Sequence, residues 1–244
     1  MILRSILVFF FTIGPAAGKT LTLAAEDNYY PFSAEIDGEL VGFVPELAVA
    51  AFKAVGVDVN FRTDPYPRVL LLVERGHVAG GFTGAIDESN ESAFHWHSTP
   101  LSVVQLAIWG RTGLDKEGLT AKDMHGERVS VTRGFFYTDA IDTNDKILKI
   151  VAPSDASSLK MLALGRSDYA LVTENIGNTI VRESVHPLLE TRVEIVGLIA
   201  EVPLFAFFSK SHPEGKEASV LFQQGIEIII ENGTYSELME RWQD

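Results

Sequence analysis

The order of strands and helices in the first third of the chain most constrains its fold. Residues 20–24 alternate polar and apolar side chains, which is typical of a strand. Apolar residues at helical spacing follow over 44–56, and a second strand pattern covers 57–62. A short helix over 66–76 and a strand over 78–84 complete the series. Strands that alternate with helices in this way predict parallel pairing, with helices on the faces of the sheet.

Two long extended apolar segments, at about 103–110 and 202–210, divide the rest of the chain. A second set of strands and helices lies between them, and helices follow the later segment. If both segments cross between two units, the second unit is an insertion. We therefore predict a two-lobed α/β fold, each lobe a mostly parallel sheet flanked by helices, with two hinge strands. Lobe 1 would comprise 19–106 and 206–244, and lobe 2 would comprise 107–205, with strand-end loops of both lobes facing one cleft.

Residues 1–18 have the character of a secretory signal peptide. Arg4 precedes an apolar run from Ile6 to Ile13, and small residues follow, with cleavage expected near Gly18. The apolar run is too short to span a bilayer. The alternative is a membrane anchor or a buried first strand. A cleavable signal peptide predicts that the mature protein is soluble in the periplasm.

Composition excludes several classes of function. The chain of 244 residues has 33 acidic and 20 basic residues, a net charge of -13. Nucleic-acid affinity comes largely from Lys and Arg that neutralise phosphates, so a nucleic-acid partner is disfavoured. The chain contains no cysteine, which excludes thiol catalysis and cysteine-based metal sites. We expect a monomer without a cofactor.

Seven short motifs occur in a fixed order along the chain. They are YYPF, DGELVGFVPELAVAAFKAVG, LVERGHVAGGFTG, STPL, GLTAKDMHGERVSVTRG, LALGRSDYALV and NGTYSELMERW. This set resembles the type II periplasmic solute-binding proteins, specifically the family 3 extracellular binding proteins that typically serve polar amino-acid importers. The resemblance covers the whole chain after the signal peptide. It implies the two-lobed fold and a small polar ligand held between the lobes.

The sequence departs from the family at the expected ligand carboxylate site. The family places an Arg before the Ser-x-Pro-Tyr motif, where a guanidinium can donate two parallel bonds to a carboxylate. Residues 78–110 contain no Lys or Arg, and Glu91 is nearest by spacing. Arg68, at the start of a helix, or Arg133, at the end of a strand, could replace the clamp. Otherwise both are solvated surface residues, and the ligand is not a standard α-amino acid.

Other candidate ligand contacts follow from the resemblance, and each has a structural alternative. Tyr30 or Phe32, in an aromatic turn, would pack on the ligand or belong to the core. Thr83 and Gly84, at the end of a strand, would form hydrogen bonds with the ligand. Aromatic residues after Gly134 would wall the cleft from the other lobe. An acid and an amide after the strand at 169–173 would bind an ammonium or cap the following helix. These candidates are Tyr30 and Phe32, Thr83 and Gly84, Phe135 and Tyr137, and Glu174 and Asn175.

His95 and His97 form a His-x-His pair that would share one face of a strand. Such a pair could suit a metal ion, but spacing supplies no third ligand. We therefore expect two histidines without a metal-binding role.

The function that these features favour is ligand capture. We expect a periplasmic solute-binding protein that traps an amino acid or a related carboxylate or amine by hinge closure and delivers it to an ABC permease. One alternative is a periplasmic enzyme on the same fold, similar to cyclohexadienyl dehydratase, with Glu174 as general acid. The other is the ligand-sensing partner of a signalling system. No nucleophile–base pair emerges from the spacing, so we predict that the chain is not an enzyme.

Overall fold

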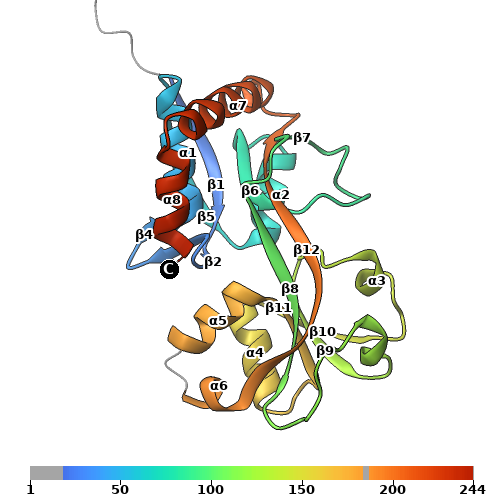
Figure 1. Cartoon of the computed structure of the whole chain (residues 1–244). Coiled ribbons are helices and arrows are strands. Elements are labelled where there is room, and N and C mark those ends of the chain that lie inside the picture. Colours follow the sequence, from blue (N-terminus) through green and yellow to red (C-terminus); the bar gives the residue numbers. More distant parts are fainter. Residues whose placement is uncertain (1–18, 184–186, 244) are drawn as a thin grey trace, which may run out of the picture.

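The computed structural model describes residues 19–183 and 187–243, so the expected signal peptide at 1–18 lies outside the described residues. The described chain forms two α/β lobes that two long strands connect (Figure 1). The two-lobed mixed fold predicted from the sequence is therefore confirmed. The described chain also contains two short helices, α3 (Asp139–Asp142) and α6 (Pro187–Arg192), and a 3-10 turn at Ala121–Met124.

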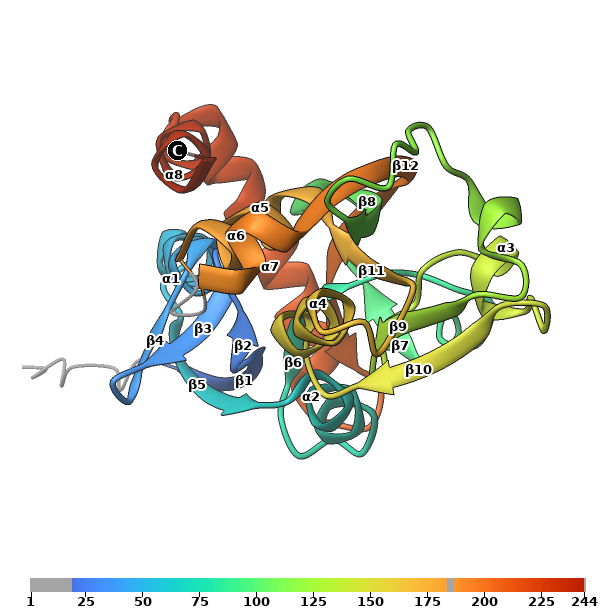
Figure 2. The same cartoon turned by 90° about the horizontal axis from the view of Figure 1, so that it is seen from below.

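The first lobe is built on three parallel strands. Strand β1 (Thr20–Glu26) pairs in parallel with β5 (Asp58–Asp64) on one side and with β6 (Gly80–Gly84) on the other. Helices α1 (Phe43–Ala54) and α2 (Tyr66–Glu74) connect them, as the sequence pattern predicts. The C-terminal helices α7 (Gly215–Glu231) and α8 (Thr234–Gln243) return to this lobe and pack beside α1 (Figures 1 and 2).

The second lobe repeats this arrangement with a second parallel set. Strand β9 (Arg128–Thr132) pairs in parallel with both β10 (Leu148–Ala152) and β11 (Tyr169–Thr173). Helix α4 (Asp155–Ala163) packs on β9 and β11, and α5 (Glu174–Glu183) follows β11 directly.

The two lobes are joined through a pair of antiparallel strands, β8 (Ser102–Arg111) and β12 (Val193–Ser209). Strand β12 is 17 residues long and starts earlier than the sequence pattern indicates. Its residues 193–204 pair with β8, and the following residues pair with β6 and with β7 (Phe94–Trp96). Hydrogen bonding therefore runs through one nine-stranded sheet, in which eight strands form a continuous path and β7 pairs with β12 beside it, but no described strand other than β12 links the two groups.

One small sheet does not follow from the strand patterns in the sequence. Strands β2 (Asn28–Tyr29), β3 (Ser33–Ile36) and β4 (Glu39–Val41) form an antiparallel meander between β1 and α1. Strands of two to four residues carry too little alternation to be recognised from a pattern.

Aromatic packing attaches the C-terminal helices to the first lobe. Phe222 of α7 lies with its ring centroid 5.5 Å from that of Phe52 in α1 and 5.5 Å from that of Phe208 in β12. Gly225 allows α7 to approach α1 closely, because a Cβ there would lie 2.0 Å from the carbonyl oxygen of Ala51. The strands of the first lobe are thereby supported by a tightly packed core.

Candidate functional site between the lobes

A cavity of about 180 Å³ lies between the two lobes. Pockets for drug-sized ligands span roughly 300–1,000 Å³, so this cavity suits a smaller molecule. Its walls come from strand ends, from the loops that follow them, and from the crossing strands β8 and β12. The lining residues are Glu26, Tyr29, Tyr66, Leu70, Thr83, Ala85, Asp87, Ser89, Asn90, Val104, Leu106, Gly134, Phe135, Phe136, Tyr137, Asp155, Val172, Thr173, Val202 and Leu204.

Polar groups reach this cavity because parallel strands of both lobes end at it. Glu26 is the last residue of β1, and Thr173 is the last residue of β11. Thr83 lies next to the end of β6 and has a φ of 61°, a left-handed conformation that non-glycine residues seldom adopt. Residues in such conformations cluster at ligand sites. The rule that ligands bind beyond the carboxyl ends of strands is therefore met by both lobes.

Three acids line the cavity, and two of them are deeply buried. Glu26 is 8% exposed and Asp155, the first residue of α4, is 5% exposed. Burial, with the nearby charge of Asp155, raises the pKa of Glu26 well above its ordinary value. Burial raises the pKa of Asp155 to about 6, although the Thr132 hydroxyl, which donates to its carboxylate, acts in the opposite direction. The two carboxyl groups thus form one buried acidic wall, and the empty cavity disfavours negative charge on both of them at once.

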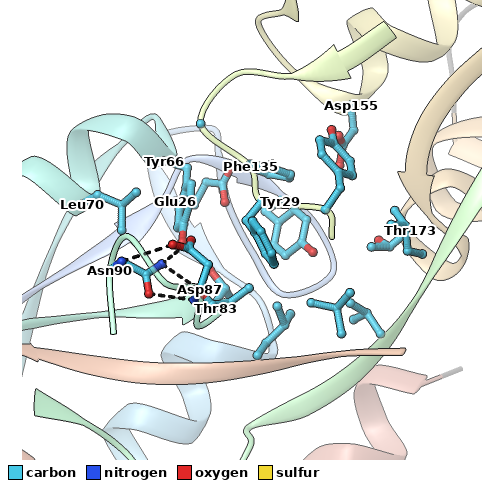
Figure 3. Close-up of a pocket in the computed structure, with 18 of the residues that line it drawn as sticks. Glu26, Tyr29, Tyr66, Leu70, Thr83, Asp87, Asn90, Phe135, Asp155 and Thr173 are labelled. Atoms are coloured by element: carbon cyan, nitrogen blue, oxygen red, sulfur yellow. Dashed lines mark hydrogen bonds between the residues drawn. The ribbon is translucent and has the colours of Figure 1, made fainter. Parts of the chain in front are cut away.

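The third acid, Asp87, holds the loop after β6 in shape. Its carboxylate accepts hydrogen bonds from the backbone N–H of Ser89 at 2.6 Å and from the Asn90 side-chain amide at 2.8 Å. Figure 3 shows these bonds between Asp87 and Asn90 at the edge of the cavity. The acid-rich loop therefore uses one of its acids to fix its own conformation.

Aromatic rings from both lobes meet at the cavity. Phe135, in the loop after β9, contacts Tyr29 at a centroid distance of 5.6 Å and Tyr66 at 5.4 Å, both edge to face. In Figure 3, Glu26 lies among these three rings. Burial raises the pKa of both tyrosines, so their hydroxyls remain protonated. Because Phe135 belongs to the second lobe and both tyrosines to the first, the lobes are in contact.

Three of the residues chosen from the sequence line this cavity: Thr83, Phe135 and Tyr137. The Tyr137 hydroxyl accepts a hydrogen bond of 2.6 Å from the backbone N–H of Thr132, which directs its ring toward the cavity wall. The structure brings these three residues together from β6 and from the loop after β9.

Most other candidates lie outside the cavity wall. Tyr30, Phe32 and Asn175 line a second hollow beside Trp242. Glu91 lines a surface hollow next to the Asp87 loop. The sequence-predicted candidates are therefore divided among the cavity and two other hollows.

The two candidate arginines are exposed. Arg68 makes an ion pair with Asp64 at 3.2 Å and does not line the cavity between the lobes. Arg133 lines a surface hollow that shares Glu26, Phe135 and Asp155 with the cavity. Arg133 is therefore adjacent to the candidate site, in a hollow that shares two of its acids.

Gly84 and Glu174 have structural surroundings that account for them. A Cβ on Gly84 would lie 2.8 Å from the rings of Phe207 and Trp96, so the glycine permits close packing. Glu174 begins α5, where an acid interacts favourably with the helix dipole.

Sequence reasoning missed Glu26, Tyr29, Tyr66, Asp155 and Thr173. A signal was present, because each lies at, or just after, the carboxyl end of a strand that the pattern indicates. Tyr29 was passed over for its neighbour Tyr30, yet β2 pairing buries Tyr29 and leaves Tyr30 half-buried.

Within residues 19–183 and 187–243, no group of three or more metal-ligating side chains comes together. His97 is buried against Phe222 at 5.1 Å and its Nδ1 lies 2.6 Å from the Thr99 carbonyl oxygen. No helix in the described part of the chain has the length and apolar character needed to cross a membrane.

Two α/β lobes, two connecting strands and a small cavity between strand ends define a periplasmic-binding-protein type of fold. Residues 21–244 match the bacterial extracellular solute-binding proteins, family 3, and the chain belongs to this family. The resemblance noted from the seven motifs is thereby confirmed. Proteins of this family are extracellular or periplasmic.

Three solved structures share the fold over nearly their whole length. A histidine kinase sensor domain with similarity to periplasmic binding proteins has a TM-score of 0.83 and 22% identity, covering 92% of this chain and 96% of its own. An ancestral arginine-binding protein bound to arginine has a TM-score of 0.79 and 22% identity, with coverages of 91% and 97%. The ancestral amino acid-binding protein AncCDT-1, a precursor of cyclohexadienyl dehydratase, has a TM-score of 0.76 and 20% identity, with coverages of 91% and 94%. A search among curated protein sequences found no match.

Proposed function

We propose that this protein is a periplasmic solute-binding protein that traps a small polar ligand between its lobes and delivers it to an ABC permease. The observation that carries the proposal is the cavity, whose charged and aromatic walls come from both lobes. Only a closed arrangement lets both walls contact one ligand. A ligand that binds the closed form more tightly than the open form therefore shifts the population toward closure.

We place the lobe boundaries at 19–106 with 206–244 and at 107–205. The change of partners along β12 supports this division, because pairing passes from β8 to β6 between Leu204 and Phe205. Residues 1–18 would direct secretion and would be removed.

We expect binding without turnover. The enzyme alternative assigns a general acid to Glu174, which lies at the start of α5 and outside the cavity wall. Formation of product from prephenate, lost in Glu174→Gln, would favour the enzyme. The sensing alternative has support from the similarity to a histidine kinase sensor domain, and it needs the same ligand site.

A thermal-shift screen of amino acids, small carboxylates, amines and short peptides tests the proposal. A ligand at about 100 times its Kd stabilises the native state by about 2.7 kcal/mol. For a chain of this size that corresponds to a rise in Tm of roughly 5–10 °C. No rise with any solute class would contradict a binding function.

Matched variants locate the site. Val202→Trp would fill the cavity and abolish the shift, because Val202 lines it. Val103→Trp, on the adjacent strand, points to the second hollow instead and should keep the shift. Loss of the shift in Val103→Trp alone would move the site to the second hollow.

A further inference from the structure

The cavity has acids and no cationic side chain. Its lining residues are all described, and they include Glu26, Asp87 and Asp155 but no Lys, Arg or His. Arg68 is engaged by Asp64, and Arg133 lies in the neighbouring surface hollow. A ligand carboxylate inside this cavity would meet negative charge and no side-chain counterion.

Among the described residues, one of the acids has no hydrogen-bond donor for its carboxyl group. Asp87 is committed to its own loop, and Asp155 accepts from the Thr132 hydroxyl. No residue in 19–183 or 187–243 donates a hydrogen bond to the Glu26 carboxylate, although the residue is only 8% exposed. Burial raises the pKa of Glu26, so the empty cavity favours its neutral form, and a positively charged donor from a ligand would stabilise the carboxylate.

The remaining wall suits an organic cation. Tyr29 and Tyr66 lie close enough to Glu26 for its charge to raise their pKa values, and Phe135 contacts both rings (Figure 3). Tyr137 adds a fourth ring to the cavity wall. Aromatic faces attract ammonium and guanidinium groups, and they also pack on methylene groups. Val104, Leu106 and Leu204 supply an apolar floor from the crossing strands.

Building on the proposed function, we propose that the cavity binds a small organic amine that carries no carboxylate. Its cationic group lies against Glu26 and the free oxygen of Asp155, and its carbon chain packs on the aromatic rings. The missing family Arg is then explained by the ligand, because a ligand without a carboxylate needs no clamp. Arg133, outside the cavity, is not required for binding.

Isothermal titration calorimetry with matched pairs tests this inference. Each pair joins an amine to its parent amino acid: agmatine and arginine, cadaverine and lysine, putrescine and ornithine, histamine and histidine. We expect at least one amine to bind, and to bind roughly tenfold or more tightly than its parent, since the added carboxylate enters an acidic cavity without a partner.

Two variants with the same change in charge assign the contact. Glu26→Gln should weaken amine binding by roughly tenfold to a hundredfold, because a hydrogen bond between charged groups is lost. Glu88→Gln, in the exposed part of the Asp87 loop, should leave affinity within about twofold. Thermal unfolding without ligand checks that both variants fold.

Three results would overturn the inference. An amino acid could bind as tightly as its amine, the amines could fail while another solute class binds, or Glu26→Gln could leave amine affinity unchanged. Each of these leaves the proposed binding function intact. Only the failure of every solute class in the thermal-shift screen would remove both proposals.

Discussion

Asp155 shows how a buried carboxyl group lowers the stability of the folded protein. Its side chain is 5% exposed at the first turn of α4 and faces Glu26 on β1, with Tyr29 and Tyr137 nearby. Burial raises its pKa from 3.8 to about 6. The folded state therefore binds a proton more tightly than the unfolded state, and stability falls as pH rises from about 3.8 to about 6.

Removing this charge should stabilise the unliganded protein. Asp155→Asn keeps an oxygen that can accept from Thr132 and removes the buried charge. At pH 8 we expect its free energy of unfolding to exceed that of the wild type by about 1–3 kcal/mol. At pH 4 the difference should nearly vanish, because the wild-type carboxyl is then protonated. Urea denaturation at both pH values measures this.

The control for this prediction is Asp145→Asn, which neutralises an exposed acid in the same lobe. It should change stability by no more than about 0.5 kcal/mol at either pH. If Asp155→Asn were less stable than the wild type at pH 8, the loss of its hydrogen bonding would outweigh the relief of buried charge.

Among the elements, helix α4 determines where Asp155 lies, because Asp155 is its first residue. Ser154 precedes the helix in an extended conformation, and its hydroxyl accepts a hydrogen bond of 3.2 Å from the backbone N–H of Ser157. This cap satisfies one of the free N–H groups at the helix start. The first turn of α4, with its buried acid, therefore begins at a defined residue.

Loss of the cap should cost stability without removing the helix. Ser154→Ala should lower the free energy of unfolding by about 1 kcal/mol, as measured by urea denaturation. Ser157→Ala retains the backbone N–H that the cap uses, so its effect should stay within about 0.5 kcal/mol. Equal losses in both variants would mean that the hydroxyl–hydroxyl contact at 3.0 Å, and not the cap, stabilises this turn.

For the whole molecule, contact between the lobes depends on a short loop of the second lobe. Phe135 reaches two tyrosines of the first lobe, and a Cβ on Gly134 would lie 2.8 Å from Pro67. Gly134 has a φ of 80°, so the loop needs both its small size and its conformational freedom. Protein groups of both lobes therefore hold the lobes in contact in this structure.

Removing the ring should favour the open form. Each aromatic pair contributes about 0.5–1.5 kcal/mol, so Phe135→Ala should shift the closed-to-open ratio by roughly fivefold to a hundredfold. Small-angle X-ray scattering of the unliganded protein should give a larger radius of gyration. Leu148→Ala serves as the control, because Leu148 is an exposed apolar residue of the second lobe that does not line the cavity, and it should leave the scattering unchanged. Unaltered scattering in Phe135→Ala would mean that other contacts hold the lobes together.

The sequence alone determined the strand and helix order, because periodicity and strong stop signals act within a few residues. The parallel set in each lobe, the two crossing strands and the strand at 128–132 all followed from it. The motifs also led to the correct family. Thr83, Phe135 and Tyr137 were found because they follow strand ends that the pattern indicates.

Only the tertiary structure decided which strand-end residues face one another. Glu26 and Asp155 are 129 positions apart in the chain, and nothing local shows that one lobe will bring its acid beside the acid of the other. The local pattern likewise favoured Tyr30, whereas Tyr29 lines the cavity. The pairing of β2 with β3 determines which of the two rings is buried. The charge and size of the cavity are properties of two surfaces in contact, and they exist only after the lobes have met.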